Sequence, residues 1–130
     1  MKIYCCGCEK QVRTVIKDGL VVYPHRPDLK NKEFYVCESC NNFVGMNSRS
    51  GEPLGVIPTK EISSFRQTIH GLIDPLWKDG KISRSKLYKI LSKKVGYEYH
   101  TADLRTIDEC RNIIRIAIKL RRKIYGYGVK

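Results

Sequence analysis

Apolar residues recur at helical spacing through the second half of the chain. Thr59 can act as the N-cap of a first helix, and apolar positions then repeat every three or four residues. Pro75 lacks a backbone N–H, so we expect a break or kink there, with Asp74 capping a separate turn that Asp79-Gly80 closes. The apolar face of this helix consists of Ile62, Phe65, Ile69, Leu72, Ile73 and Leu76.

Two further helices follow in the same half. Ser83 predicts the N-cap of one, which ends near Gly96. Thr106, with Glu109 three residues later, matches a capping box and opens a long helix that Gly126 ends. The predicted core positions are Leu87, Leu91 and Val95 on the shorter helix, and Cys110, Ile113, Ile114, Ala117, Leu120 and Ile124 on the longer one.

The first half has the pattern of strands. Val12 to Ile16 alternates between apolar and polar residues, and Gly19 to Tyr23 is rich in β-branched and aromatic residues. Asp18-Gly19 between them predicts a hairpin turn. Phe34 to Cys37 predicts a third strand, and the segment from Asn41 to Pro58 has the composition of a loop.

Together these patterns predict an α+β fold. We expect a zinc-binding β-module at residues 1–58, similar to a zinc ribbon, and a basic helical region at residues 59–130. A chain of 130 residues has room for one domain of this kind, so we expect the β-module to pack on a bundle of three to four helices.

The cysteines indicate a metal site rather than disulfides. No apolar run approaches the about 20 residues that span a bilayer, and the first residues lack the apolar region of a secretory signal. We therefore expect a cytoplasmic protein with no membrane partner, in which thiols stay reduced. In that setting the six cysteines favour metal binding.

Two Cys-x-x-Cys pairs give the ligand set. Cys5 and Cys8 are separated from Cys37 and Cys40 by 28 residues, and a sheet between them can bring both turns together. Four thiolates fill the coordination sphere of one Zn²⁺, which makes the ion structural and leaves no position for substrate water. Cys6 is an alternative to Cys5, although it leaves a single residue before Cys8.

Charge is concentrated in the helical region. The chain carries a net charge of +12, and residues 61–130 hold sixteen basic and seven acidic residues, net +9. Like charges at helical spacing repel, so stripes of them favour an anionic partner, DNA or RNA, over a merely solvated face. The two predicted stripes are Lys86, Lys89 and Lys93, and Arg111, Arg115, Lys119 and Arg122.

Tyrosines flank these helices. Tyr97, Tyr99, Tyr125 and Tyr127 can stack on unpaired bases or serve as core and rim aromatics. The sequence leaves both roles open.

A polar stripe runs along the first long helix. Arg66, His70 and Asp74 recur every fourth residue, and an imidazole paired with a carboxylate can act in acid–base chemistry. A structural network between helices and a binding role are the alternatives. A hydrolase or nuclease using His70 and His100 requires the fold to bring the two imidazoles together, and the acidic residues are too scattered to favour it.

The ordered motifs resemble an uncharacterised zinc-finger-containing domain family of bacteria and their phages. The match covers about residues 5–115. Its motifs are Cys5-x-x-Cys8, Cys37-Glu38-Ser39-Cys40, Val44-Gly45, Pro53-Leu54-Gly55, Arg66-x-x-x-His70, Asp74-Pro75-Leu76-Trp77, Ser83-Arg84, Tyr88, His100 and Cys110. The resemblance implies zinc binding in a bacterial cell and a shared polar site of Arg66, His70, Asp74, Arg84 and His100, with no chemistry assigned. Glu9 departs from the family's glycine at that position, Cys6 is an extra cysteine, and Thr101-Ala102 replace small apolar residues and glycine.

The sequence therefore predicts a non-enzymatic, zinc-binding, nucleic-acid-binding accessory or regulatory protein of a phage or mobile element. The first alternative is a phage-encoded inhibitor that binds a host protein in a nucleic-acid or defence complex. The second is a metal-dependent hydrolase or nuclease. The pattern does not specify the oligomeric state or choose between DNA and RNA.

Overall fold

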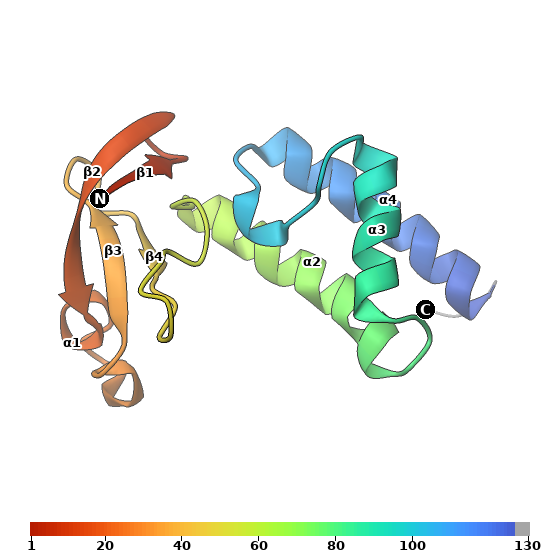
Figure 1. Cartoon of the computed structure of the whole chain (residues 1–130), viewed down its shortest axis with the longest axis horizontal. Coiled ribbons are helices and arrows are strands. Elements are labelled where there is room, and N and C mark those ends of the chain that lie inside the picture. The colour runs from red at the N-terminus through yellow and green to blue at the C-terminus, as the bar shows by residue number, and fades with distance from the viewer. Residues whose placement is uncertain (127–130) are drawn as a thin grey trace. The chain divides into compact units, whose positions relative to one another are not determined.

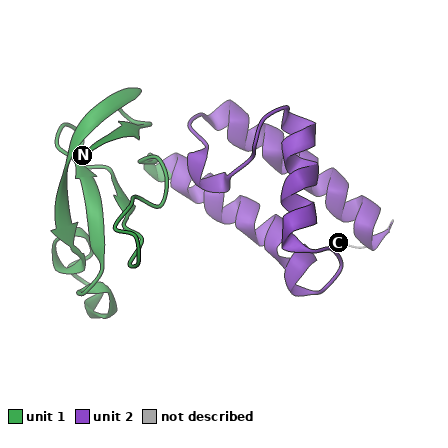
Figure 2. Ribbon diagram, in the orientation of Figure 1, with its two compact units in different colours: residues 1–60 green, residues 61–130 purple. Residues whose placement is uncertain are grey.

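The computed structural model describes residues 1–126, and the chain falls into two compact units, residues 1–60 and 61–130 (Figure 2). The architecture is α+β, as predicted, with the strands in the first unit and the long helices in the second. The expectation that the two parts pack together as one domain stays a prediction. The first unit contains β1 (Lys2–Cys5), β2 (Lys10–Asp18), α1 (Gly19–Val22), the 3-10 turn η1 (Pro27–Leu29), β3 (Glu33–Cys37) and β4 (Phe43–Gly45).

The strands of the first unit form one antiparallel sheet in the order β1-β2-β3-β4 (Figure 1). Cys5 pairs with Lys10 at the end of β1, and Cys37 pairs with Thr14 at the end of β3. Both strands therefore end on a cysteine of the predicted metal site. The core beneath the sheet is small and consists of Ile3, Cys5, Val12, Tyr35, Cys37, Val44 and Ile57.

The strand predictions at Val12–Ile16 and Phe34–Cys37 are confirmed within β2 and β3. β1 and β4 were not predicted. Each has only three or four residues, too few for alternation to stand out from the neighbouring turns.

The hairpin predicted at Asp18-Gly19 is wrong, because the chain begins the short helix α1 there. The Asp18 carboxylate caps this helix by accepting hydrogen bonds from the backbone N–H groups of Leu20 and Val21, at 3.0 and 3.2 Å. A side chain at Gly19 would collide with the backbone of Leu29, since a Cβ there would lie 1.7 Å from the Leu29 carbonyl oxygen. The glycine thus serves a close approach between two segments rather than a hairpin turn.

The second unit is built from three long helices, α2 (Lys60–Lys78), α3 (Arg84–Val95) and α4 (Ile107–Tyr125), with the 3-10 turn η2 (Thr101–Asp103) before α4. Their shared core is mainly aliphatic, with Tyr99 also fully buried. It contains Ile69, Ile73, Leu76, Leu87, Leu91, Cys110, Ile113 and Ala117, all fully buried. Among residues 1–126, no helix combines the length and apolar character needed to cross a membrane.

The predicted ends of α3 and α4 are confirmed. The Ser83 hydroxyl accepts from the backbone N–H of Lys86, and Gly96 closes α3 in the left-handed conformation, with φ at 85°. Thr106 and Glu109 form the full capping box of α4, in which each side chain accepts from the other residue's backbone N–H. These local signals act over three or four residues, so the sequence alone displays them.

The break predicted at Pro75 is wrong, because α2 continues through this residue to Lys78. Pro75 lies in the last turn, where its missing N–H costs a single bond. Asp74 does not cap a new turn, since its carboxylate accepts from the Trp77 indole. The predicted stop at Asp79-Gly80 is confirmed: Gly80 has φ at 73°, and the next backbone N–H donates to the Leu76 carbonyl at 3.0 Å.

Candidate metal centre

Two turns bring four thiols together at one end of the sheet. The sulfurs of Cys5, Cys8, Cys37 and Cys40 all lie within 4.8 Å of one another. Cys5 Sγ is 3.5 Å from Cys40 Sγ, and Cys8 Sγ is 3.8 Å from Cys37 Sγ. A tetrahedral zinc with bonds of about 2.3 Å places its sulfurs about 3.8 Å apart, whereas a disulfide needs about 2.05 Å. The cluster therefore fits one structural Zn²⁺, as predicted.

The two Cys-x-x-Cys turns have the same backbone form. The N–H of Glu9 donates to the Cys5 carbonyl at 2.7 Å, and the N–H of Asn41 donates to the Cys37 carbonyl at 3.0 Å. Glu9 and Asn41 both have positive φ, 56° and 65°. Asparagine adopts this conformation more readily than most residues, while glutamate does so at a cost. The geometry thus gives a reason for the glycine that the family resemblance implies in place of Glu9.

Backbone N–H groups stabilise negative charge in the second turn. Desolvation raises the pKa of the Cys37 thiol, but hydrogen bonds, chiefly from the backbone N–H groups of Cys40 and Ser39, outweigh this effect and bring the pKa down to about 7. Desolvation also raises the pKa of Cys40, against the N–H of Asn42. At Cys8, desolvation, with help from the Cys37 thiol, raises the pKa to about 12. Backbone N–H groups therefore favour the thiolate form of Cys37, which is the form in which cysteine binds a metal ion.

The segment before α2 holds the first turn in place. The N–H of Ile57 donates to the Tyr4 carbonyl at 2.9 Å, and the N–H of Cys6 donates to the Ile57 carbonyl at 2.8 Å. A Cβ on Gly7 would lie 2.6 Å from the Asn42 side-chain nitrogen, so the two turns approach closely at this glycine. The sulfur of Cys6 is not part of the four-thiol cluster, and the structure gives no support to Cys6 as a ligand in place of Cys5.

The predicted cationic stripes lie on the surface of α3 and α4. All seven side chains are exposed: Lys86, Lys89, Lys93, Arg111, Arg115, Lys119 and Arg122. Within residues 1–126 the structure gives none of them an ion pair. Lys86 and Lys119 line the same hollow, so the two stripes come together at that point.

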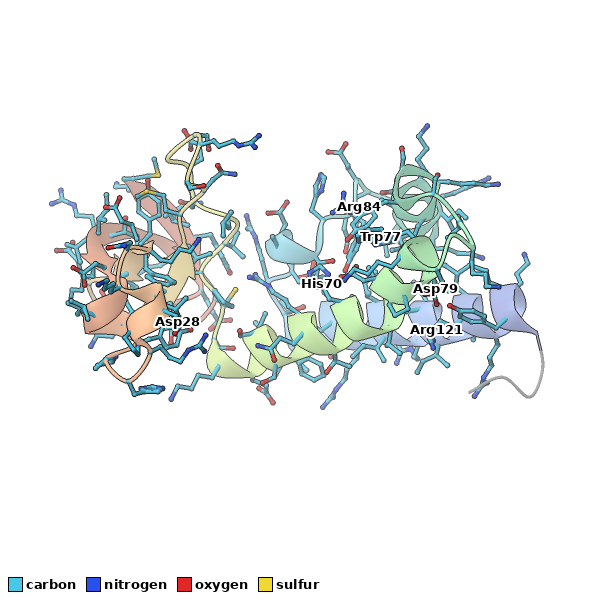
Figure 3. All side chains as sticks on the ribbon, turned by 90° about the horizontal axis from the view of Figure 1, so that it is seen from below. Asp28, His70, Trp77, Asp79, Arg84 and Arg121 are labelled. Carbon is cyan, nitrogen blue, oxygen red and sulfur yellow. The ribbon has the colours of Figure 1, made fainter. Side chains whose placement is uncertain are left out.

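Part of the polar stripe forms a connected network on α2 and α3 (Figure 3). His70 Nδ1 lies 3.3 Å from an Asp74 carboxylate oxygen, and the Trp77 indole N–H donates to the other oxygen at 3.2 Å. The Arg84 guanidinium lies 5.8 Å from the centre of the Trp77 ring, in cation–π contact. His70, Asp74 and Arg84 are thus linked through Trp77.

The other two residues of the predicted polar site have partners of their own. The Arg66 guanidinium donates to the Leu104 carbonyl at 2.9 Å, which ties α2 to the segment before α4. His100 Nε2 lies 3.2 Å from a Glu98 carboxylate oxygen. His70 and His100 therefore pair with different carboxylates.

The flanking tyrosines differ in accessibility. Tyr99 is 1% exposed and shares a hydrogen bond of 2.8 Å with Thr101, so it is a core residue that cannot stack on a base. The Tyr125 hydroxyl donates to Asp79 at 3.1 Å. Tyr97 is 48% exposed. Tyr127 lies outside the described residues.

Comparison with known proteins adds one finding. A family model described as a zinc-finger-containing domain matches residues 1–120. No curated protein and no solved structure matches the chain. The matched residues include both Cys-x-x-Cys turns and most of α4, so the match covers the sheet unit and the helical unit alike.

Proposed function

The chain belongs to this zinc-finger-containing domain family, and from that premise we propose that its helical unit binds nucleic acid while one structural zinc holds the sheet unit. The observation that carries the proposal is the surface of α3 and α4. Between Ser83 and Val95 there is no acidic residue, and none follows Glu109. The seven stripe cations are exposed and lack ion pairs within residues 1–126, which leaves them free for phosphates.

The energetics favour an anionic partner. Neighbouring like charges at i, i+4, such as Arg111 and Arg115, repel by about 0.2–0.5 kcal/mol per pair. Helices that carry several such pairs gain stability when phosphates neutralise them. Phosphate contacts fix position and carry no sequence information, so the stripes imply binding with little sequence preference.

Binding is tested by fluorescence anisotropy of labelled 20-nucleotide probes: single-stranded DNA, duplex DNA and single-stranded RNA, each over a series of salt concentrations. The variant replaces Arg111, Arg115, Lys119 and Arg122 together with glutamine. Each lost phosphate contact lowers the slope of log K against log salt by about one, so we expect a slope about four smaller for duplex DNA.

A matched control removes the same charge elsewhere. Lys2, Lys10, Lys30 and Lys32 are exposed in the sheet unit, and their replacement by glutamine leaves the same net charge as the stripe variant. We expect this control to keep nearly the full affinity and slope. Equal losses in both variants, or no binding by the unmodified protein, contradict the proposal.

The hydrolase alternative has less support. It needs His70 and His100 to act together, and the two pair with Asp74 and Glu98 instead. A role in a phage or mobile element, within a bacterial cytoplasm, belongs to the same proposal and rests on the family resemblance.

A further inference from the structure

A hollow of about 900 Å³ lies between α3 and α4 and is also lined by the turn at residues 80–83. Its floor is aliphatic: Ile82 and Ile90 line one side, and Ile116, Leu120 and Ile124 line the other. The three residues of α4 recur every fourth position, so they form one row along the helix. We call this hollow the α3–α4 groove.

The floor of the groove is distinct from the core of the unit. All five of its aliphatic side chains are half-buried, whereas Leu91 and Ala117, next in sequence to two of them, are fully buried. Besides its core face, α4 thus has a second apolar row that remains open to solvent, to which Ile90 of α3 and the preceding Ile82 add. An accessible apolar row of this kind favours a partner that covers it.

The rim of the groove carries only one sign of charge. Five lysines line it, Lys81, Lys86, Lys94, Lys119 and Lys123, and no acidic residue among residues 1–126 does. An occupant must therefore be apolar along its centre and anionic along its edges.

A nucleic acid meets only half of this requirement. Its phosphates complement the lysines, but bases stack on aromatic rings, and the groove lining within the described part of the chain contains no aromatic side chain. An amphipathic helix meets both halves, because its apolar residues at i, i+3, i+4 and i+7 enter a groove while its flanks stay in water. The row from Ile116 to Ile124 extends over eight residue steps, or about 12 Å, which matches about two turns of such a helix.

We propose that the α3–α4 groove binds an amphipathic helix of a partner protein, with aliphatic residues on the bound face and glutamate or aspartate on both flanks. This interaction is separate from the proposed nucleic-acid binding, although Lys86 and Lys119 belong to both surfaces.

The probe is a fluorescein-labelled 16-residue helical peptide with leucines at i, i+3, i+4 and i+7 and glutamates on both flanks. Binding to the full chain is measured by anisotropy at about 150 mM salt, where exposed charges more than about 8 Å apart are largely screened and close ion pairs still contribute. Two matched peptides replace either the leucines by serine or the glutamates by glutamine. We expect both to bind at least about tenfold more weakly than the probe.

Matched substitutions in the protein separate the groove from its surroundings. Ile116→Gln changes the groove floor, whereas Ile118→Gln changes an isoleucine of the same helix that lies outside it and is 37% exposed. Lys94→Glu changes the rim, whereas Lys93→Glu changes its neighbour outside the groove. We expect the groove variants to weaken peptide binding about tenfold and their controls by less than about twofold.

Several results overturn the proposal: failure of the probe to bind, equal binding of the serine peptide, or equal losses in groove and control variants. A fatty-acid site is indicated if dodecanoate displaces the probe and the serine peptide binds as well as the probe. That result also overturns the proposal. Ile124→Gln, near the end of α4, replaces Ile116→Gln if circular dichroism shows that the latter is unfolded.

The same variants separate this inference from the proposed function. We expect Ile116→Gln to leave the affinity for duplex DNA unchanged and Lys93→Glu to reduce it. Peptide binding by the unmodified protein without any DNA binding contradicts the proposed function alone, and DNA binding by the unmodified protein without any peptide binding contradicts the groove alone.

Discussion

The sheet unit and the helical unit achieve stability in different ways. Two of the seven core residues in the sheet unit are cysteines of the four-thiol cluster, Cys5 and Cys37. Within residues 61–126, the core of the helical unit contains no residue of that cluster and consists mainly of aliphatic side chains, together with Tyr99 and Cys110. A unit of 60 residues with so small a core needs a staple, which the zinc supplies. Metal binding therefore stabilises the sheet unit, whereas hydrophobic packing stabilises the helical unit of the same chain.

The largest expected effect comes from removing the metal. A strong zinc chelator is expected to unfold residues 1–60, because zinc binding contributes about 10 kcal/mol or more to the folding of small zinc modules. The helices of residues 61–126 are expected to remain. Amide NMR spectra of the full chain measure this: the dispersed signals of the sheet unit collapse while those of the helical unit persist. Retention of the sheet signals, or loss of both sets, contradicts the division of roles.

Next in size is a cavity in the helical core. Ile69 is fully buried on α2, and Ile69→Ala is expected to lower the free energy of unfolding of the helical unit by about 2–5 kcal/mol. The zinc content is expected to stay unchanged, since Ile69 belongs to the helical unit and the four cysteines of the cluster all belong to the sheet unit. Urea unfolding followed by circular dichroism, with metal analysis of the same sample, measures both. Ile118→Ala, at an exposed site, is the control and is expected to cost less than about 1 kcal/mol.

The capping box of α4 tests local stabilisation in the helical unit. Thr106→Ala removes the oxygen that accepts from the Glu109 N–H at 3.1 Å, and we expect a loss of about 1 kcal/mol. Thr106→Ser keeps that oxygen and is expected to restore most of the stability. If Thr106→Ser loses as much stability as Thr106→Ala, packing of the threonine methyl group, rather than capping, is responsible.

The smallest effect is a gain in the sheet unit. Glu9 has φ at 56°, which glycine adopts without steric cost, so Glu9→Gly is expected to raise the stability of the zinc-bound form by about 0.5–1 kcal/mol. Asn41→Gly, in the matching turn, is expected to change it by no more than a few tenths, because asparagine tolerates this conformation. Thermal unfolding of the zinc-loaded variants compares the two. A larger gain at Asn41 than at Glu9 contradicts the explanation.

Features that act over a few residues were predictable from the sequence. The paired cysteines, the caps at Ser83 and Thr106 and the stop at Gly80 each depend on spacing that the chain displays directly. Asp18-Gly19 was misread because an Asp-Gly pair serves both a hairpin and a helix start. The choice depended on Leu29, ten residues further along the chain, whose backbone lies against Gly19.

Contacts between distant residues could not be predicted. The Arg121 guanidinium donates to the Leu72 carbonyl at 2.9 Å, and the Tyr125 hydroxyl donates to Asp79, so that the end of α4 is tied to α2. Such pairs join residues far apart in the chain, so they produce no periodic pattern in the sequence. The α3–α4 groove was missed for a different reason: the pattern assigned Leu120 and Ile124 to the core, and only the structure shows which apolar row the core covers.

The central claim is that four thiolates hold one zinc ion and thereby stabilise the sheet unit. X-ray absorption at the zinc edge, on purified protein, tests it most directly. The account predicts one zinc per chain with four sulfur neighbours at about 2.3 Å. A coordination shell that includes nitrogen or oxygen, or folded protein without zinc, would contradict it.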